Sequence, residues 1–263
     1  MTKQTPQQRA KNDRPDLTNL VLPPRLELDH PLVKTPSFRA AQSCMNTILK
    51  RNRIGLLDGP PGTGKTTFAQ WAAERCGRPS AVAAMPENPA PNDFLRVSIV
   101  AVTGHNPSGH NKTEMEAELI AALADWQGLL ILDEIQNVGL RGLTEARYIH
   151  DMTRPRFPML LVGWGAGKTV RENEPLSDRI RQRRYFKPLE GEDLFTTVRA
   201  IDERLTGVSD NVLRYADDRY AKGVLRRWVA LIETLQDWEV EEANQDDLTD
   251  AIISITEGEN DAA

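Results

Sequence analysis

The sequence predicts an α/β protein in which helices cover both faces of a parallel sheet, followed by a smaller, all-helical unit. Two observations support this fold class. Short apolar segments alternate with amphipathic helical segments up to about residue 189, as in chains built from βαβ units. After Pro188, four helical segments follow with no strand between them. We therefore expect a polar, disordered arm at 1–30, a core at 31–189, a helical unit at 190–257 and an acidic tail at 258–263.

The elements follow from apolar periodicity and from turn residues. Buried strands are expected where short apolar runs end in turn residues, at 54–57, 81–85, 128–132 and 158–163. Core helices are expected at 65–76, 93–102, 113–126 and 144–152, with a loop at 104–111. The helical unit is expected to contain helices at 190–205, 210–215, 218–238 and 246–255.

Composition excludes several classes of protein. The chain has 263 residues and a net charge of −5, ordinary values for a globular protein. Its apolar runs are a few residues long, whereas a membrane span needs about 20, so no membrane association is expected. The first residues lack the apolar stretch of a secretory signal, and the two cysteines fit a reducing environment, so we expect a cytoplasmic protein.

Charge is distributed unevenly along the chain. From Asp237 to the end there are ten acidic residues and no Lys or Arg, which leaves residues 1–236 with a net charge of +5. An acidic segment of this kind is either a solvated helix face with a frayed end or a docking segment for a partner, and its role stays open.

The most specific motif is a phosphate-binding loop. Residues 59–66 read Gly-Pro-Pro-Gly-Thr-Gly-Lys-Thr, follow a predicted strand and open a predicted helix, which is the context that the motif requires. Backbone N–H groups and the helix N-terminus would surround the phosphates of ATP, Lys65 would reach the β- and γ-phosphates, and Thr66 would bind Mg²⁺. The expected nucleotide-binding residues are Gly59, Pro60, Pro61, Gly62, Thr63, Gly64, Lys65, Thr66 and Thr67.

A second Gly-rich segment, at 163–169, resembles this motif but has three residues between Gly163 and Gly167 where four are required. The residues after it do not favour an apolar helix packed under a sheet. We interpret it as a turn after a strand, with Lys168 near the γ-phosphate or near DNA.

Two carboxylates follow the most hydrophobic strand. Asp133 and Glu134 come directly after 129–132, about 70 residues beyond the loop. Burial beside such a strand is costly for a carboxylate unless a cation or hydrogen bonds compensate. We therefore expect Asp133 to hold Mg²⁺ together with Thr66, and Glu134 to orient and deprotonate the attacking water.

With these motifs and a helical unit after the core, the chain resembles the AAA+ class of P-loop ATPases. The resemblance implies a sensor arginine at a Gly-x-x-Arg helix start, which Gly223–Arg226 matches, so the sensor would be Arg226. It also implies an arginine finger that acts in a neighbouring subunit. Arg179 matches that position best, and Arg183 and Arg184 are the alternatives. The first sensor is normally a polar residue directly after the strand that ends at Gly163, but Trp164 stands there, so either a later residue serves or hydrolysis is slow.

Residues 158–163, 176–179 and 184–194 are similar, more narrowly, to the TniB, TnsC and MuB group of transposition ATPases. That resemblance implies an ATPase that polymerises on double-stranded DNA and recruits or activates a transposase, with a target-selection protein as a further candidate partner. Its DNA-tracking residues would match Asn92, Arg96, Lys112 and Thr113 here.

Two other functions stay open. A helicase loader or replication initiator shares part of these motifs, although such loaders commonly carry an N-terminal domain for which 1–30 is short. A nucleotide switch without hydrolysis is disfavoured by Glu134 and weakly favoured by Trp164. The choice between a filament and a closed ring is also open.

Overall fold

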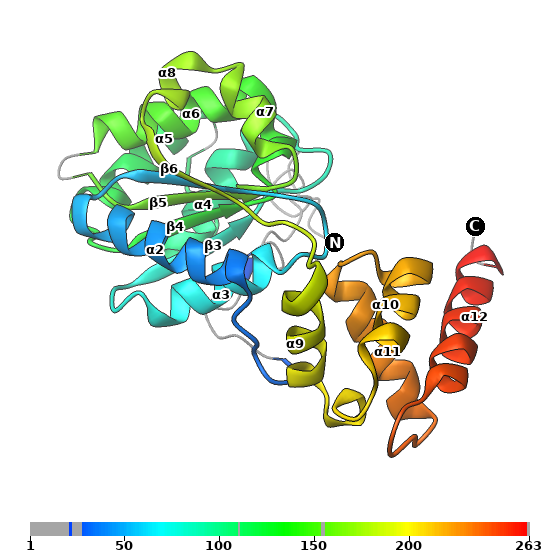
Figure 1. Cartoon of the computed structure of the whole chain (residues 1–263). Helices are drawn as coiled ribbons and strands as arrows, with labels where there is room; N and C mark the ends of the chain where they lie inside the picture. The colour runs from blue at the N-terminus through cyan, green and yellow to red at the C-terminus, as the bar shows by residue number, and fades with distance from the viewer. Residues whose placement is uncertain (1–20, 23–27, 110, 154–155, 262–263) are drawn as a thin grey trace, which may run out of the picture.

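The computed structural model describes residues 21–22, 28–109, 111–153 and 156–261. Its centre is a single sheet with the strand order β1-β3-β4-β5-β2-β6 (Figure 1). Strands β2 to β6 are parallel, and β1 pairs antiparallel with β3. The predicted α/β class with a parallel sheet is therefore confirmed. The strands are β1 Val21–Leu22, β2 Ile54–Asp58, β3 Ser80–Ala84, β4 Leu129–Asp133, β5 Met159–Gly163 and β6 Ile180–Tyr185.

Helices cover both faces of the sheet. Successive residues of its apolar strands point to opposite sides, so each strand contributes buried side chains to both layers. In β2, Leu57 packs toward α2 (Pro36–Arg51) and α3 (Lys65–Arg75), whereas Leu56 packs toward the other layer. Ile131 and Leu130 divide in the same way in β4. The second layer contains α4 Asp93–Thr103, α5 Lys112–Ala124, α6 Gly139–Met152, α7 Ala166–Arg171 and α8 Glu174–Ser177, with the 3-10 helix η2 Ile135–Val138 before α6.

Helix α2 and strand β6 are among the core elements that were not predicted. Helix α2 begins at Pro36, and the Thr35 hydroxyl caps it by accepting a hydrogen bond from the backbone N–H of Phe38. Strand β6 reads Ile-Arg-Gln-Arg-Arg-Tyr, and only its first residue is buried. Charged residues are common on an edge strand, because they discourage pairing with other chains. Strand β6 therefore lacks the apolar run by which a strand is recognised in the sequence.

The segment after Gly163 corrects one prediction. We expected a turn there, but residues Ala166–Arg171 form the short helix α7, in which Ala166, Gly167 and Val170 are buried. Gly165, in the left-handed conformation with φ of 67°, provides the change of direction before the helix.

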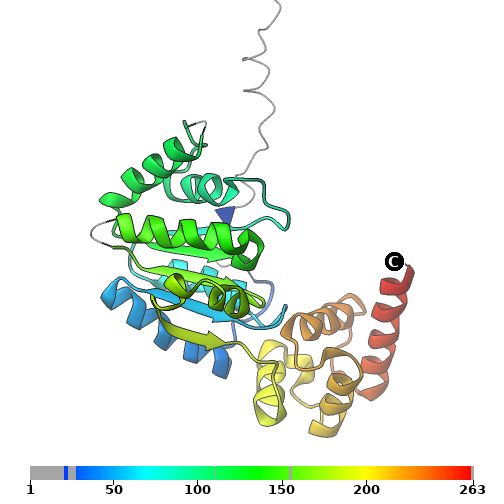
Figure 2. The same cartoon turned by 90° about the horizontal axis from the view of Figure 1, so that it is seen from above.

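The helical unit has its own core around Trp228, which is fully buried. One predicted helix, at 218–238, is wrong because Lys222 and Gly223 take positive φ values and interrupt it. A π-helical turn, η4, precedes the break and α11 follows it. Figures 1 and 2 show α9 next to the core and α12 on the far side of the unit. Its elements are α9 Gly191–Ile201, η3 Glu203–Leu205, α10 Asp210–Ala216, η4 Asp217–Ala221, α11 Leu225–Asp237 and α12 Gln245–Asp261.

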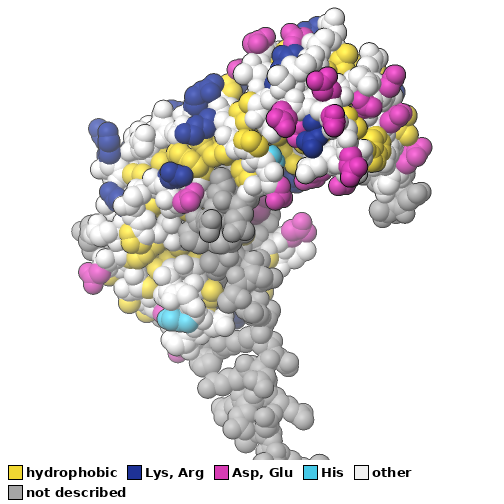
Figure 3. Space-filling model, turned by 90° about the horizontal axis from the view of Figure 1, so that it is seen from below, with side chains coloured by type: hydrophobic (Ala, Val, Ile, Leu, Met, Phe, Trp, Pro, Cys, Tyr) yellow, Lys and Arg dark blue, Asp and Glu magenta, His cyan; other side chains and the backbone are white. Residues whose placement is uncertain are grey.

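The described residues near the two chain ends do not form the simple arm and tail that the sequence predicts. Val21–Leu22 extend the sheet beside β3, whereas residues 1–20 and 23–27 of the expected arm lie outside the described residues. At the other end, α12 continues to Asp261, so helix includes part of the expected acidic tail. On the face drawn in Figure 3, most acidic side chains gather on the helical unit. Within the described ranges, no helix is both long and apolar enough to cross a membrane.

Candidate nucleotide site

The Gly-rich loop lies between β2 and α3, and its neighbours leave no room for a side chain at Gly59 or Gly62. A Cβ on Gly59 would lie 2.3 Å from the backbone oxygen of Phe186, and one on Gly62 would lie 2.7 Å from Cγ1 of Val224. Both glycines also have positive φ values, 146° and 74°. Glycine is therefore required at both positions by space as well as by backbone conformation. The second contact joins the loop to the helical unit.

Lys65 points back into this loop. Its ammonium donates to the backbone oxygens of Gly59 and Pro60, in both cases over 2.7 Å. Burial lowers the pKa of Lys65, and the negative charges of Glu134, Asp133 and Asp58 oppose that shift. A cation held in this way by two neutral carbonyls can exchange them for phosphate oxygens, which are stronger acceptors because they are charged.

Thr66 and Asp133 lie close together at the carboxyl ends of the parallel strands. The Thr66 hydroxyl donates to Oδ2 of Asp133 over 2.7 Å, and Oδ1 accepts from the backbone N–H of Glu134 over 2.9 Å. Burial raises the pKa of Asp133, whose exposed fraction is 2%. A hydroxyl oxygen beside a carboxylate that is costly to bury without a cation fits Mg²⁺, which prefers oxygen ligands.

Glu134 lies at the mouth of the site. It has a left-handed backbone with φ of 51°, an uncommon conformation for a residue other than glycine. Its side chain is exposed and lines the same cavity as Lys65 and Thr66. A solvent-accessible carboxylate in this position can accept a proton from a water molecule.

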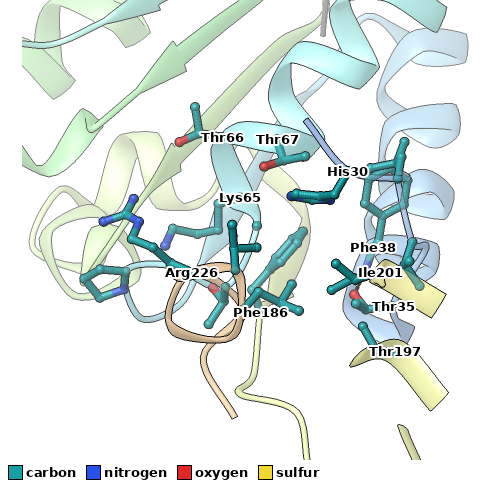
Figure 4. Close-up of a pocket in the computed structure, with 18 of the residues that line it drawn as sticks. His30, Thr35, Phe38, Lys65, Thr66, Thr67, Phe186, Thr197, Ile201 and Arg226 are labelled. Carbon is teal, nitrogen blue, oxygen red and sulfur yellow. Dashed lines mark hydrogen bonds between the residues drawn. The ribbon is translucent and has the colours of Figure 1, made fainter. Parts of the chain in front are cut away.

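A cavity of about 340 Å³ extends from the loop to the helical unit (Figure 4). Lys65 and Arg226 lie on one side of it, and His30, Phe38, Ile201 and Thr197 lie on the other. The first side is cationic and suits phosphates, whereas the second has an apolar lining with a few polar groups and suits a flat heterocycle. The residues of the cavity lining that sequence reasoning missed are His30, Leu32, Val33, Thr35, Phe38, Phe186, Thr197, Ile201, Leu225 and Val229.

Arg226 reaches the cavity from the first turn of α11. Its backbone N–H donates to the oxygen of Gly62 over 3.1 Å, which fixes the start of α11 against the Gly-rich loop. The absence of a side chain at Gly223 lets the chain pass close to Leu189, because a Cβ there would lie 2.3 Å from the backbone oxygen of Leu189. The helix break at Gly223 thereby allows α11 to begin beside the Gly-rich loop. The Gly-x-x-Arg pattern therefore coincides with a helix start that faces the loop.

Arg179 lies away from this cavity. Its guanidinium forms two contacts with the carboxylate of Asp151, over 2.8 and 2.7 Å, and donates to the oxygen of Pro175. Arg183 donates to Ser177, and Arg184 to the oxygen of Ala40. No finger candidate lines its own chain's cavity in the described part of the chain.

Trp164 also lines the cavity and is 60% exposed. Its indole carries one N–H donor and no acceptor. The segment that follows it is joined to the Gly-rich loop through Asp58, which accepts from the backbone N–H groups of Gly59 and Gly167 over 2.8 and 3.1 Å. Lys168 is exposed and is not part of the cavity lining.

The expected DNA contacts lie on the layer formed by α4, α5 and α6. Lys112 forms ion pairs with Glu145 over 2.7 Å and with Glu116 over 3.5 Å, and Arg96 pairs with Asp93 over 3.4 Å. Asn92 lines a shallow hollow together with Glu145, and Thr113 is exposed. The two cations would have to exchange carboxylates for phosphates to bind DNA, so their role stays a prediction.

Comparisons with known proteins agree with this geometry. Residues 48–170 match a family described as AAA domain. The structure is similar to Orc1 of Aeropyrum pernix, solved in complex with DNA, with a TM-score of 0.61, 18% sequence identity and coverage of 86% of this chain. It is also similar to RuvB of Thermotoga maritima, a Holliday junction branch migration motor, with a TM-score of 0.53, 17% identity and coverage of 83%.

The chain has the α/β P-loop AAA+ fold. The chain spans 66% of the Orc1 chain, slightly less than two thirds, and 68% of the RuvB chain. No curated protein matches it. The expected AAA+ resemblance therefore holds at the level of fold, whereas the narrower resemblance to transposition ATPases stays a prediction.

Proposed function

We propose that this AAA+ chain hydrolyses ATP and acts on double-stranded DNA as a regulator of transposition. One observation carries the enzymatic part. Lys65, Thr66 and Glu134 line one cavity, the buried carboxylate of Asp133 is hydrogen-bonded to Thr66, and Arg226 enters the cavity from the helical unit. These residues supply phosphate binding, magnesium ligation, a general base and a second cation.

In the proposed reaction, the backbone N–H groups of the loop and Lys65 hold the phosphates of ATP. Thr66 and Asp133 would hold Mg²⁺, which neutralises charge on the β- and γ-phosphates when bound. Glu134 orients a water molecule toward the γ-phosphorus and accepts its proton. Arg226 stabilises the negative charge on the phosphates, so closure of the helical unit on the core is linked to nucleotide binding.

The finger assignment implies self-assembly. Arg179 is held outside its own cavity by Asp151, so a role in catalysis requires the site of another copy. A guanidinium delivered in this way contributes about 10³–10⁵ in rate in comparable enzymes. We therefore propose a ring or helical filament in which the site is complete only between neighbours.

Binding to DNA is proposed through Asn92, Arg96, Lys112 and Thr113. Few contacts per copy suffice when many copies bind side by side, because their contributions add along the duplex. The similarity of segments 158–163, 176–179 and 184–194 to the TniB, TnsC and MuB group is what suggests a transposase as the partner, with a target-selection protein as a further candidate.

A second candidate function is that of a replication initiator or helicase loader. The specific observation in its favour is the structural similarity to Orc1 of Aeropyrum pernix. An initiator of this kind would use the same ATPase site but would assemble on a limited DNA segment or on a protein ring instead of along any duplex.

Electron microscopy with duplex DNA tests the proposal, in the presence and in the absence of a non-hydrolysable ATP analogue. Continuous filaments that require the analogue are the expected result. Discrete particles of one size on the DNA would favour the initiator. No nucleotide-dependent assembly on DNA would contradict the transposition function and the form of the initiator that assembles on DNA.

A further inference from the structure

Gln136 lies beside the proposed general base and was not singled out by any motif. It is the second residue of the 3-10 helix η2 at the end of β4. Its side-chain amide donates to Oε2 of Glu134 over 2.5 Å. The amide therefore binds one carboxylate oxygen of Glu134, and this contact leaves Oε1 for the water molecule.

The other end of the same amide lies against the end of β5. A Cβ on Gly163 would lie 2.0 Å from Oε1 of Gln136, so the absence of a side chain at Gly163 is what makes room for it. That oxygen is buried and makes no hydrogen bond to the described residues. A buried acceptor without a partner costs free energy, so the fold alone gives no reason to keep a glutamine here.

The side-chain amide of Gln136 lies close to the position directly after β5, where the AAA+ resemblance implies a polar first sensor and this chain has Trp164. Directly after β5, where a polar residue would face the phosphates, the chain has an exposed indole with no acceptor. The side chain of Gln136 instead places a polar group at the end of β5, between Gly163 and the carboxylate of Glu134. The polar contact at this strand end thus comes from η2.

We propose that Gln136 is the positioning residue of Glu134, holding its carboxylate in the orientation that activates water. This inference rests on the proposed ATPase function. Because Gln136 acts through Glu134, its removal should slow the chemical step while ATP binding, which depends on the Gly-rich loop, is retained. Misplacement of a catalytic group by about 1 Å can cost about 100-fold in rate.

The test compares Gln136→Met, which keeps the side-chain volume and removes the amide, with Asn137→Ala as the matched control. Asn137 is the next residue of η2, and its amide donates to the oxygen of Met85 instead of to Glu134. For Gln136→Met we expect kcat to fall by about 10- to 100-fold with KM within about threefold of the wild-type value. Asn137→Ala should retain kcat within about threefold.

Two further measurements separate positioning from a structural role. The melting temperature of Gln136→Met should equal or exceed that of the wild type, since the variant loses a buried acceptor without a partner. In a double-mutant cycle, Gln136→Met should cause almost no further loss in a Glu134→Gln background, because the group that it positions is already disabled.

Each outcome is distinct. An unchanged kcat in Gln136→Met, or losses that multiply fully with those of Glu134→Gln, would overturn the inference while leaving the ATPase assignment intact. A wild-type chain that binds ATP but does not hydrolyse it, with or without duplex DNA, would overturn the proposed function itself and the inference with it.

Discussion

The hydroxyl of Thr66 donates to the carboxylate of Asp133 over 2.7 Å, although the two residues are 67 positions apart in the chain. This bond joins the first turn of α3 to the end of β4 across the sheet edge. It brings together the two oxygen ligands that the sequence assigns to Mg²⁺. The pair is therefore arranged by the protein itself, so the proposed binding of Mg²⁺ with ATP would require little reorganisation.

Replacement of Lys65 by alanine is expected to lower the affinity for ATP by at least tenfold, because hydrogen bonds to charged groups contribute about 1.5–3 kcal/mol each. Titration with a fluorescent ATP analogue measures the change. The matched control is Lys168→Ala, in the second Gly-rich segment, which should bind ATP as the wild type does. Equal affinity for Lys65→Ala and the wild type would contradict the loop assignment.

Replacement of Arg226 by alanine is expected to reduce kcat by at least about tenfold, because the helical unit then no longer supplies a cation to the phosphates. Steady-state phosphate release measures the effect. Arg219→Ala is the control, since Arg219 lies over the ring of Tyr215 in the same unit, outside the cavity lining. If the two variants were equally active, Arg226 would not be a sensor.

Mixing two inactive variants tests Arg179 as a finger. Arg179→Ala retains its Gly-rich loop, and Lys65→Ala retains its arginine, so some mixed interfaces should contain a complete site. We expect each variant alone to be nearly inactive and the mixture to recover part of the wild-type ATPase rate. Arg181→Ala, on the exposed edge strand β6, serves as the control that should remain active.

A mixture that stays as inactive as its components, while both still assemble with wild-type protein, would rule out Arg179. Arg183 and Arg184 would then be examined in the same way. If Arg179 is the finger, it must leave Asp151 to act, so salt that weakens this partly exposed ion pair should not abolish the recovery.

Acid should destabilise the fold through His150. This side chain is buried, and burial together with the nearby charge of Arg156 lowers its pKa from 6.5 to about 4. The unfolded chain therefore binds a proton at a higher pH than the folded chain, so stability is lost as pH falls from about 6.5 toward about 4. The full shift corresponds to about 3 kcal/mol.

Urea denaturation between pH 7 and pH 4.5 measures this dependence. His150→Gln keeps a donor toward the oxygen of Phe157 but cannot titrate, so its stability should fall less steeply over this range than that of the wild type. Parallel slopes for the two proteins would show that carboxylates, and not His150, dominate the acid response.

The parts of the fold with strong local patterns were predictable. The apolar strands β2, β3, β4 and β5 and the loop between β2 and α3 have signals that depend on neighbouring residues alone. Strand β6 was missed because its edge position permits Arg at three of its six residues. Helix α7 was missed because six residues are too few for a clear period. The break before α11 depends on positive φ at Lys222, which no composition rule demands.

The candidate site likewise contains residues that were predictable from the sequence and residues that were not. Lys65, Thr66, Asp133 and Glu134 follow from motif spacing, because the chemistry of phosphate binding fixes their order. The apolar side of the cavity contains residues from α2, α9 and α11 that are far apart in sequence, such as Phe38, Ile201 and Val229. Only tertiary packing brings them together. The contact of Gln136 with Glu134 likewise depends on a left-handed residue and on the space left by Gly163.

Measurements of ATP binding and ATP turnover by the wild type and by Glu134→Gln, each with and without duplex DNA, decide whether this site is an ATPase. We expect the wild type to hydrolyse ATP, faster when DNA brings copies together, and the variant to bind ATP with similar affinity. Turnover by the variant should be lower by about 10²-fold or more, because the general base is lost while Thr66 and Asp133 remain. Equal turnover by the two proteins, or no turnover by the wild type under either condition, would contradict the proposed ATPase mechanism.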